Sequence, residues 1–334
     1  MTLAALGFGP DFAEQAEGAS VARISDVHRD EVRGLTGSDQ VSLLLPNGLK
    51  LRQITVGDWV TFDPESGLIA RVLDRRTVLK RGAAGNAARA QLIAANVDTL
   101  FIVTSCNHDF NLARLERYLA LAQSVGTTPL ILLTKADDPA EPRNYLGEAQ
   151  GLSPLADALA LNAHDADDLA RLAPWVQPGM TAALVGSSGV GKSTILNGLT
   201  GAGAITQGIR EDDSRGRHTT TARALRQTTH GGWLIDTPGM RSLALRDTGD
   251  GIEQVFADLV ALEPDCHFSD CTHQHEPGCA ILAAVDAGQA DAARVARWLK
   301  LRAEDQLNTA TGFSARQKQK AAGQRPARKK KKKR

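Results

Sequence analysis

A run of nine residues at positions 186–194 constrains this chain more than any other feature. It reads Gly-Ser-Ser-Gly-Val-Gly-Lys-Ser-Thr and matches the phosphate-loop pattern G-x-x-x-x-G-K-[ST]. A strand-like segment, 181–185, precedes it, and residues 193–199 are expected to open a helix. Glycines let consecutive backbone N–H groups turn towards a phosphate, and the helix N-terminus adds its positive dipole. The run therefore predicts an α/β domain that binds a nucleotide.

Two motifs supply the predicted contacts with the phosphates and magnesium. We expect Lys192 to bridge the β- and γ-phosphates and Ser193 to place a hydroxyl on magnesium. The segment Asp236-Thr-Pro-Gly239 follows another strand, where such enzymes put a carboxylate on magnesium through water and a glycine N–H on the γ-phosphate. The predicted contacts are Gly186, Ser187, Ser188, Gly189, Val190, Gly191, Lys192, Ser193, Thr194, Asp236 and Gly239.

A third motif predicts which base is bound. Thr134, Lys135, Ala136 and Asp137 follow directly on the strand-like segment 130–133. A carboxylate at such a strand end can accept hydrogen bonds from the N1–H and the exocyclic amino group of guanine, whereas adenine offers no such donor pair. Taken alone this motif is weak, but beside a phosphate loop it indicates GTP and GDP as ligands.

The order of the motifs predicts a circular permutation. In ordinary GTPases the guanine-reading segment follows the phosphate loop, but here residues 134–137 precede residues 186–194. The site can still form, because the strands need only be neighbours in the sheet. Strand-like and helix-like segments alternate from residue 97 to residue 236, which favours a parallel sheet covered by helices on both faces.

The hydrolytic step depends on the polar segment between the phosphate loop and Asp236. Ras-like enzymes orient the attacking water with a glutamine at the position of Met240, whose side chain cannot do so. His218 is the candidate for this role, and the alternative is a solvated loop histidine. The neighbouring threonines, Thr219 and Thr220 among them, are candidates for closing on magnesium when the γ-phosphate is present.

Three of the four cysteines lie close together near the C-terminus. Cys266, Cys271 and Cys279 supply three thiolates, and His273 lies between them. A tetrahedral set of three sulfurs and one nitrogen favours a single structural zinc ion, since four protein ligands leave no open position. His267 and His275 are competing nitrogen donors. The residues around the cluster have a helical pattern, which predicts a helical zinc-binding domain.

The N-terminal part and the C-terminal tail complete the predicted organisation. Alternating segments at 21–27, 41–45, 49–54, 56–62 and 68–73 predict a small β-barrel, an OB-fold. The last 19 residues contain 11 Lys or Arg and no acid, whereas the rest of the chain carries 28 basic residues against 38 acidic ones. Such a tail is expected to be disordered, and it serves either solubility or contact with nucleic-acid phosphates. The predicted parts are residues 1–84, 85–247, 248–312 and 313–334.

Taken together, these motifs resemble the ribosome small-subunit-dependent GTPase A family, circularly permuted GTPases of late small-subunit maturation. The resemblance spans about residues 20–310 and includes Gly-Arg-His-Thr-Thr-Thr at 216–221. It implies a role for His218 in hydrolysis, His273 as the fourth zinc ligand, and contact of the barrel and the zinc domain with rRNA. One departure is Leu161-Asn162-Ala163, where the family has a Ser-Ala loop that contacts the base.

The resemblance also sets the expected partners and location. We expect a monomer that binds the small ribosomal subunit, and whose slow GTP turnover the subunit stimulates. No apolar run is long enough to cross a bilayer and no secretory signal opens the chain, so no membrane contact and a cytoplasmic location are expected. Two alternatives remain open, a P-loop kinase and an RNA-binding scaffold that holds GTP without turnover.

Overall fold

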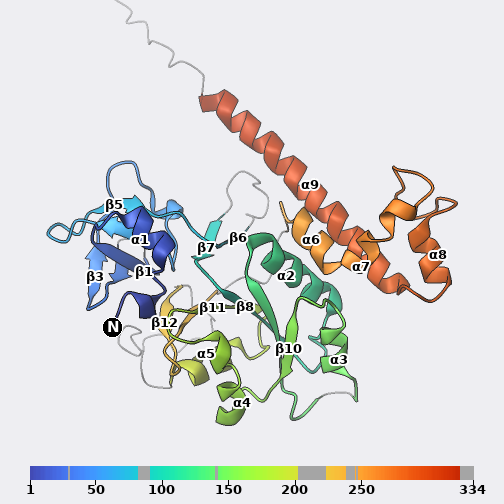
Figure 1. Ribbon diagram of the computed structural model, residues 1–334, viewed down its shortest axis with the longest axis horizontal. Coiled ribbons are helices and arrows are strands. Elements are labelled where there is room, and N and C mark those ends of the chain that lie inside the picture. Colours follow the sequence, from blue (N-terminus) through green and yellow to red (C-terminus); the bar gives the residue numbers. More distant parts are fainter. Residues whose placement is uncertain are drawn as a thin grey trace, which may run out of the picture.

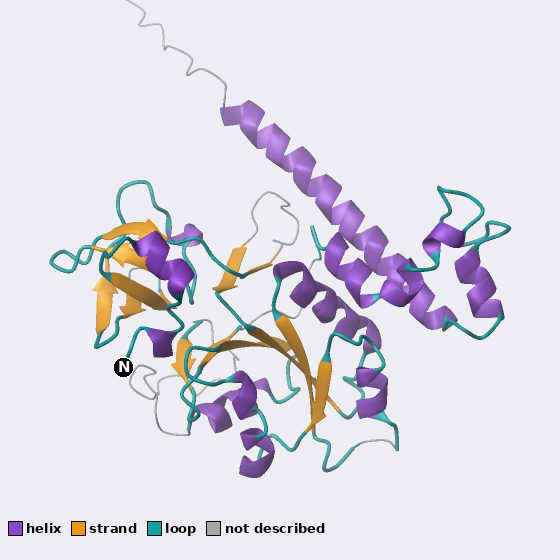
Figure 2. Cartoon of the chain, in the orientation of Figure 1, coloured by secondary structure: helices purple, strands orange, loops and turns teal. Residues whose placement is uncertain are grey.

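The computed structural model describes residues 1–28, 31–81, 91–139, 142–201, 223–237, 245 and 247–323, with side chains up to residue 310. Three parts follow one another along the chain: a small barrel, a central sheet flanked by helices, and a helical C-terminal part (Figure 1). Strands are confined to the first two parts, within the described residues, and the last part is built from helices and loops (Figure 2).

The N-terminal barrel has five antiparallel strands in the order β3-β2-β1-β4-β5. A parallel bridge between Leu44 and Leu68 joins its two edges, so the sheet closes on itself. Its interior is apolar and contains Ile24, Val60 and Ile69, none of which is exposed. The predicted OB-type barrel is therefore confirmed. Its strands are β1 (Val21–Val27), β2 (Val32–Leu35), β3 (Gln40–Leu43), β4 (Trp59–Phe62) and β5 (Ile69–Val72).

One predicted strand of the barrel was wrong, and three elements of this part were not predicted. Residues 49–54 form no strand but a 3₁₀ turn, η2 (Leu51–Gln53), because the Gln53 side chain accepts a hydrogen bond from the backbone N–H of Lys50 at 2.9 Å. The unpredicted elements are β2 and two short helices at the start of the chain, η1 (Ala4–Leu6) and α1 (Pro10–Ala16). Proline at the first position of α1 favours a helix start.

Three arginines near the end of the barrel bind the barrel itself rather than forming an open basic face. Arg75 forms an ion pair with the buried Asp58 at 2.6 Å, and Arg76 pairs with Asp11. Arg71 donates to a backbone carbonyl of α1. These guanidinium groups therefore hold α1 and the barrel strands together.

A two-stranded antiparallel sheet links the barrel to the central domain. Its strands are β6 (Val78–Arg81) and β7 (Gln91–Ala95). The predicted boundary at residues 84 and 85 falls between them, within residues 82–90, which lie outside the described part of the chain.

The central sheet has the order β10-β9-β8-β11-β13-β12, and its first five strands are parallel. The predicted parallel sheet is confirmed. Strand β12 was not predicted, and it runs antiparallel at the edge with only three residues. The strands are β8 (Thr99–Ser105), β9 (Thr128–Thr134), β10 (Asp157–Ala160), β11 (Thr181–Gly186), β12 (Leu225–Gln227) and β13 (Trp233–Asp236).

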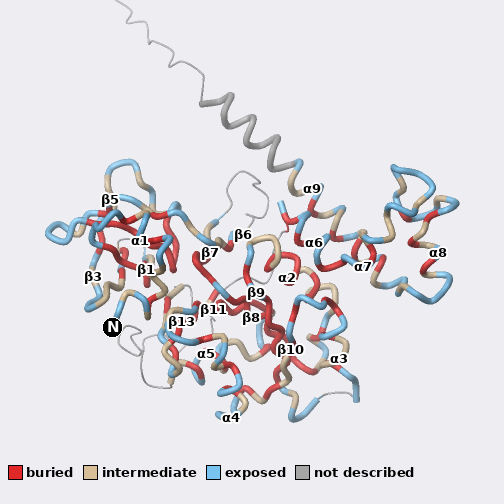
Figure 3. The backbone as a smooth tube through the Cα atoms, in the orientation of Figure 1, coloured by how far each residue is buried: buried red, intermediate tan, exposed pale blue. Residues whose placement is uncertain are grey.

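Both faces of this sheet are covered, as its continuous apolar strands predict. Leu100 and Ile102 of β8 belong to the core on one face, whereas Phe101 and Val103 belong to the core on the other. Strands β8 and β11, in the middle of the sheet, are buried along their whole length (Figure 3). The covering helices are α2 (Leu112–Val125), α3 (Tyr145–Gln150), α4 (Ala166–Ala170), η3 (Ala173–Trp175) and α5 (Lys192–Thr200).

Residues next to helix α2 in the sequence define both of its ends. The Asn111 side chain accepts a hydrogen bond from the backbone N–H of Arg114 at 2.9 Å, which caps the helix N-terminus. Gly126 ends the helix with φ of +76°, a left-handed conformation that glycine adopts without strain.

The C-terminal part packs against α2. Its helices are α6 (Gly249–Val255), α7 (Ala257–Val260), η4 (Glu263–Asp265), α8 (Ala280–Asp286) and α9 (Ala292–Gly323). An apolar stripe of α9 packs inside the domain, with Val295 and Trp298 buried. Helix α9 continues to Gly323, so the tail predicted to be disordered from residue 313 onward is helical over residues 313–323. None of the described helices is both long and apolar enough to cross a bilayer.

Ion pairs fasten the central domain to α9. The Glu116 carboxylate on α2 is fully buried and lies 2.8 Å from Arg297 and 3.5 Å from Arg294. Burial raises the pKa of Glu116, and hydrogen bonding and charge from Arg297 oppose that rise. The next residue, the half-buried Arg117, forms two bonds of 2.5 Å with Glu304. The two domains therefore meet through charged groups with little access to water.

Candidate functional site

The strand order brings the three nucleotide motifs to one edge of the central sheet. Segment 134–137 follows β9, segment 186–194 follows β11, and Asp236 ends β13. These strands lie in the parallel order β9-β8-β11-β13, so their carboxyl ends share one edge. Open α/β sheets bind ligands at this edge. The permuted order along the chain is thus compatible with one site.

Two glycines of the phosphate loop have positions that no larger residue fits without strain. Gly186 has φ of +141°, and a Cβ atom there would lie 2.2 Å from the carbonyl oxygen of Val103. Gly191 caps α5 with φ of +94°, and its Cβ would lie 3.2 Å from Thr134 Cγ2. The loop therefore packs closely against β8 and β9.

Hydrogen bonds join the phosphate loop to the guanine-reading segment. The Thr134 hydroxyl lies 2.7 Å from the carbonyl oxygen of Val190 and 3.1 Å from that of Thr104. The Lys192 ammonium group donates to the carbonyl oxygens of Gly186, at 3.0 Å, and Ser187. Thr134 thus ties together two motifs that lie more than 50 residues apart.

One cavity of about 670 Å³ connects these motifs, a size within the usual range for small-molecule sites. Asp137 lies in its wall, where its Oδ2 atom accepts a hydrogen bond of 3.1 Å from the side-chain amide of Asn162. Lys135 has φ of +57°, a strained conformation for a residue with a side chain. The lining consists of Thr134, Lys135, Asp137, Asp138, Asn162, Ala163, His164, Ser188, Gly189, Gly191, Lys192, Ser193 and Thr194.

Asp236 lies at the same edge, in register with Leu184 of β11. Burial raises the pKa of the Asp236 carboxyl, and the charge of Lys192 offsets part of that rise. The next residue, Thr237, donates its hydroxyl to the carbonyl oxygen of Leu184, which fixes the strand end. A half-buried carboxylate close to a phosphate loop is a suitable ligand for a divalent cation, directly or through water.

Several predicted site residues lie outside the described part of the chain. They include the catalytic candidate His218 and the two switch threonines, Thr219 and Thr220. Gly239 and Met240 also lie outside it.

One side chain that contacts the phosphate loop was not predicted from the sequence. Arg114, in the first turn of α2, donates a hydrogen bond to the Ser187 hydroxyl and lies 3.5 Å from the carbonyl oxygen of Asp109. Arg114 belongs to no motif, and only the folding of α2 beside the loop brings it there.

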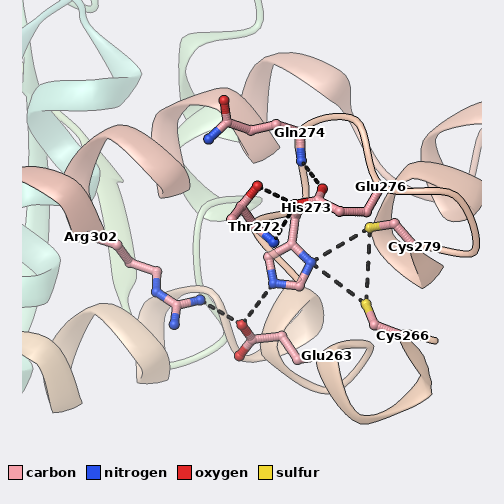
Figure 4. Close-up of polar contacts among 8 residues, drawn as sticks. All are labelled: Glu263, Cys266, Thr272, His273, Gln274, Glu276, Cys279 and Arg302. Atoms are coloured by element: carbon pink, nitrogen blue, oxygen red, sulfur yellow. Dashed lines mark hydrogen bonds and ion pairs between the residues drawn. The ribbon is translucent and has the colours of Figure 1, made fainter. Parts of the chain in front are cut away.

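The cysteine cluster forms a compact set of four ligands. The ligand atoms of Cys266, Cys271, His273 and Cys279 all lie within 4.8 Å of one another. The Nδ1 atom of His273 is 3.6 Å from the sulfurs of both Cys266 and Cys279, which are 4.0 Å apart (Figure 4). A tetrahedral zinc ion holds sulfur and nitrogen ligands roughly 3.5–3.8 Å apart. The donor set therefore fits one zinc ion.

Neighbouring side chains orient the histidine of this cluster. His273 Nε2 lies 3.1 Å from Glu263 Oε1, and the same oxygen accepts a 2.6 Å bond from Arg302 (Figure 4). The imidazole also packs beside Trp298, with ring centres 5.5 Å apart. Carboxylates that hold the second nitrogen of a ligand histidine are typical of zinc sites. Of the competing donors, His267 instead packs edge-on against Phe268.

Comparisons with known proteins agree with this geometry. A family model described as RsgA GTPase matches residues 72–246. A "Small ribosomal subunit biogenesis GTPase RsgA" from Mesorhizobium japonicum is 50% identical over 316 residues, covering 92% of this chain and 91% of the relative. A "Small ribosomal subunit biogenesis GTPase RsgA 2" from Vibrio vulnificus is 43% identical over 328 residues, covering 96% of this chain and 93% of the relative.

Solved structures also resemble the chain. YjeQ from Thermotoga maritima superposes with a TM-score of 0.60 at 25% identity, covering 84% of this chain and 96% of that one. YloQ, described as a circularly permuted GTPase, gives a TM-score of 0.58 at 23% identity, covering 85% of this chain and 94% of that one. This second likeness supports the fold alone.

Proposed function

Because this chain belongs to the RsgA GTPase family, and is therefore a GTP-hydrolysing enzyme, we propose that it acts in late maturation of the small ribosomal subunit. The proposal includes binding to the rRNA of that subunit and acceleration of GTP turnover by it. Relatives named as small-subunit biogenesis GTPases match more than nine-tenths of the chain, which supports this role. The protein would act as a monomer in the cytoplasm.

One observation carries the GTP-binding part of the proposal. The 2.7 Å contact between the Thr134 hydroxyl and the Val190 carbonyl makes the guanine-reading segment and the phosphate loop two walls of one cavity. Asp137 selects guanine, and the N–H groups of residues 186–194 with Lys192 bind the phosphates. The family match favours hydrolysis over transfer to a kinase acceptor or passive binding of GTP.

Magnesium binds with GTP in this proposal. Ser193 and Asp236 hold it, with Thr219 or Thr220 as the switch ligand, and Gly239 contacts the γ-phosphate. Magnesium neutralises charge on the phosphate oxygens. The chain itself aligns the γ-phosphate and the attacking water, whose oxygen bonds to phosphorus as the bond to the GDP oxygen breaks.

His218 orients that water, because Met240 offers no hydrogen-bonding group for the task. The imidazole accepts a hydrogen bond from the water near neutral pH, where part of the histidine is uncharged. We infer that binding to the ribosomal subunit brings His218 into this position, which explains why turnover would be slow in the free enzyme.

The zinc domain has a structural role in this proposal. One zinc ion bound by Cys266, Cys271, His273 and Cys279 fixes the loop between η4 and α8, which has too few apolar residues to fold alone. The domain and the barrel would contact rRNA from two sides of the GTPase domain, and the basic C-terminal residues would add salt-sensitive affinity.

A turnover assay tests the proposed function. GTP hydrolysis by the full chain is measured alone, with purified small subunits and with purified large subunits, and ATP serves as the control nucleotide. We expect hydrolysis of GTP but not ATP, and a rate increase with small subunits only. An equal rate with both subunits, or no increase with either, would contradict the proposal.

A further inference from the structure

We propose that Asn162 is a positioning residue that sets guanine specificity, and that Asp168 on α4 and Arg171 at the C-cap of α4 hold it in place. The inference rests on the proposed role of Asp137 as the guanine-reading carboxylate. It concerns the loop at 161–163, which connects β10 to α4.

The first observation is the contact between Asn162 and Asp137. The Asn162 amide nitrogen lies 3.1 Å from Asp137 Oδ2, in the wall of the nucleotide cavity. A carboxylate oxygen has two lone pairs, so this bond leaves both oxygens able to accept from guanine. An aspartate side chain rotates broadly about χ2, and one fixed donor restricts it to one plane. Asn162 therefore presents both oxygens of Asp137 in one orientation.

The second observation is that the Asn162 amide has a defined orientation of its own. Its Oδ1 atom accepts a hydrogen bond of 2.9 Å from the backbone N–H of His164. The oxygen must face that donor, because an amide nitrogen there would meet another N–H group. The nitrogen is consequently directed at Asp137.

The third observation is the attachment of this loop to α4. The Asp168 carboxylate accepts a 2.7 Å hydrogen bond from the backbone N–H of Asn162. Arg171 lies 2.9 Å from the other oxygen of Asp168 and donates a 3.0 Å bond to the carbonyl oxygen of Ala160. The backbone bond from Asn162 is the main cause of a lowered pKa at Asp168, so this carboxylate is charged at neutral pH. Helix α4 thereby fixes the loop on both sides of Leu161.

Guanine recognition requires this alignment. The N1–H and the 2-amino group of guanine lie side by side on one edge of the base. Both donate to the Asp137 carboxylate only when its two oxygens lie in the plane of the base. A freely rotating Asp137 would still accept one bond at a time. Inosine has the N1–H but lacks the 2-amino group, so it reports on a single bond. The preference for GDP over IDP therefore measures the orientation of Asp137.

The experiment measures dissociation constants of fluorescent GDP, IDP and ADP for the full-length chain. The variants are Asn162→Ala and Asp168→Ala, with Asp167→Ala as the matched control. Asp167 is the adjacent exposed acid in the first turn of α4. We expect the GDP-over-IDP preference to fall about tenfold in both variants, the size of one lost charge-assisted hydrogen bond. The preference in Asp167→Ala should equal that of the wild type.

The possible outcomes separate this inference from the proposed function. If both variants keep the wild-type GDP-over-IDP preference, even with weaker binding of both nucleotides, the positioning role is wrong. If only Asn162→Ala lowers it, Asp168 has no part in the mechanism. If the wild type binds ADP as tightly as GDP, the proposed guanine role of Asp137 fails instead.

Discussion

His273 directs one ring nitrogen at two cysteine sulfurs and the other at Glu263, whose Oε1 lies 3.1 Å away. Glu263 also receives the Arg302 guanidinium, so a carboxylate, an imidazole and a cation form a chain that leads from α9 into the cysteine cluster. The position of the zinc ligand thus depends on Arg302 of α9, which lies 29 residues further along the sequence.

The first prediction concerns this chain of contacts. Glu263→Gln should weaken zinc binding by roughly 10- to 100-fold, because a neutral amide holds the imidazole less firmly and lowers its basicity. Competition with a chromophoric chelator measures the change in affinity. Asp265→Asn, a nearby exposed acid on η4, is the control and should keep the wild-type affinity. Equal affinities for all three proteins would show that Glu263 does not support the site.

The second prediction concerns the contact between the central domain and α9. Glu116→Ala leaves Arg294 and Arg297 without their buried partner, and it should lower the free energy of unfolding by about 3–5 kcal/mol. Urea titration followed by circular dichroism measures the loss. Glu304→Ala breaks a half-buried pair with Arg117 and should cost about 1 kcal/mol. A smaller loss in Glu116→Ala than in Glu304→Ala would contradict the assignment of Glu116 as the main ionic link.

The third prediction compares two glycines of the phosphate loop. Gly186→Ala should destabilise the protein by several kcal/mol, because its Cβ would lie 2.2 Å from the backbone of Val103 and β8 would have to move. Gly189 also has positive φ, +81°, but no heavy atom lies within 4 Å of its Cβ, so Gly189→Ala should cost about 1 kcal/mol. Thermal unfolding of both variants tests this difference. Similar melting temperatures would refute it.

The fourth prediction concerns His218. His218→Ala should keep the wild-type affinity for GTP and lose most of the turnover stimulated by the small subunit, since the residue acts on the water and not on the nucleotide. A filter-binding assay gives the affinity and phosphate release gives the rate. His164→Ala, at a histidine that lines the nucleotide cavity, is the comparison and should retain stimulation. An unchanged stimulated rate in His218→Ala would eliminate His218 from the role.

Much of the architecture follows from local sequence patterns. The phosphate loop, Thr134-Lys-Ala-Asp137 and the three clustered cysteines have fixed spacings, because each must place several groups around one small ligand or ion. The buried strands β8, β9 and β11 are continuous apolar runs bounded by polar residues, and Asn111 and Gly126 mark the ends of α2. These signals involve residues close together in the sequence, so no knowledge of the fold is needed to interpret them.

Only the tertiary structure decided which distant residues meet. Arg114 contacts Ser187, Asn162 contacts Asp137, and Glu116 is buried between two arginines of α9. Each of these side chains belongs to an ordinary helix or loop, and its partner lies 25 or more residues away. The sequence by itself determined which side chains can bind the nucleotide and the zinc ion, because residue types at short spacings identify them. The orientation of those side chains depends on contacts between residues far apart in the sequence, which no local pattern encodes.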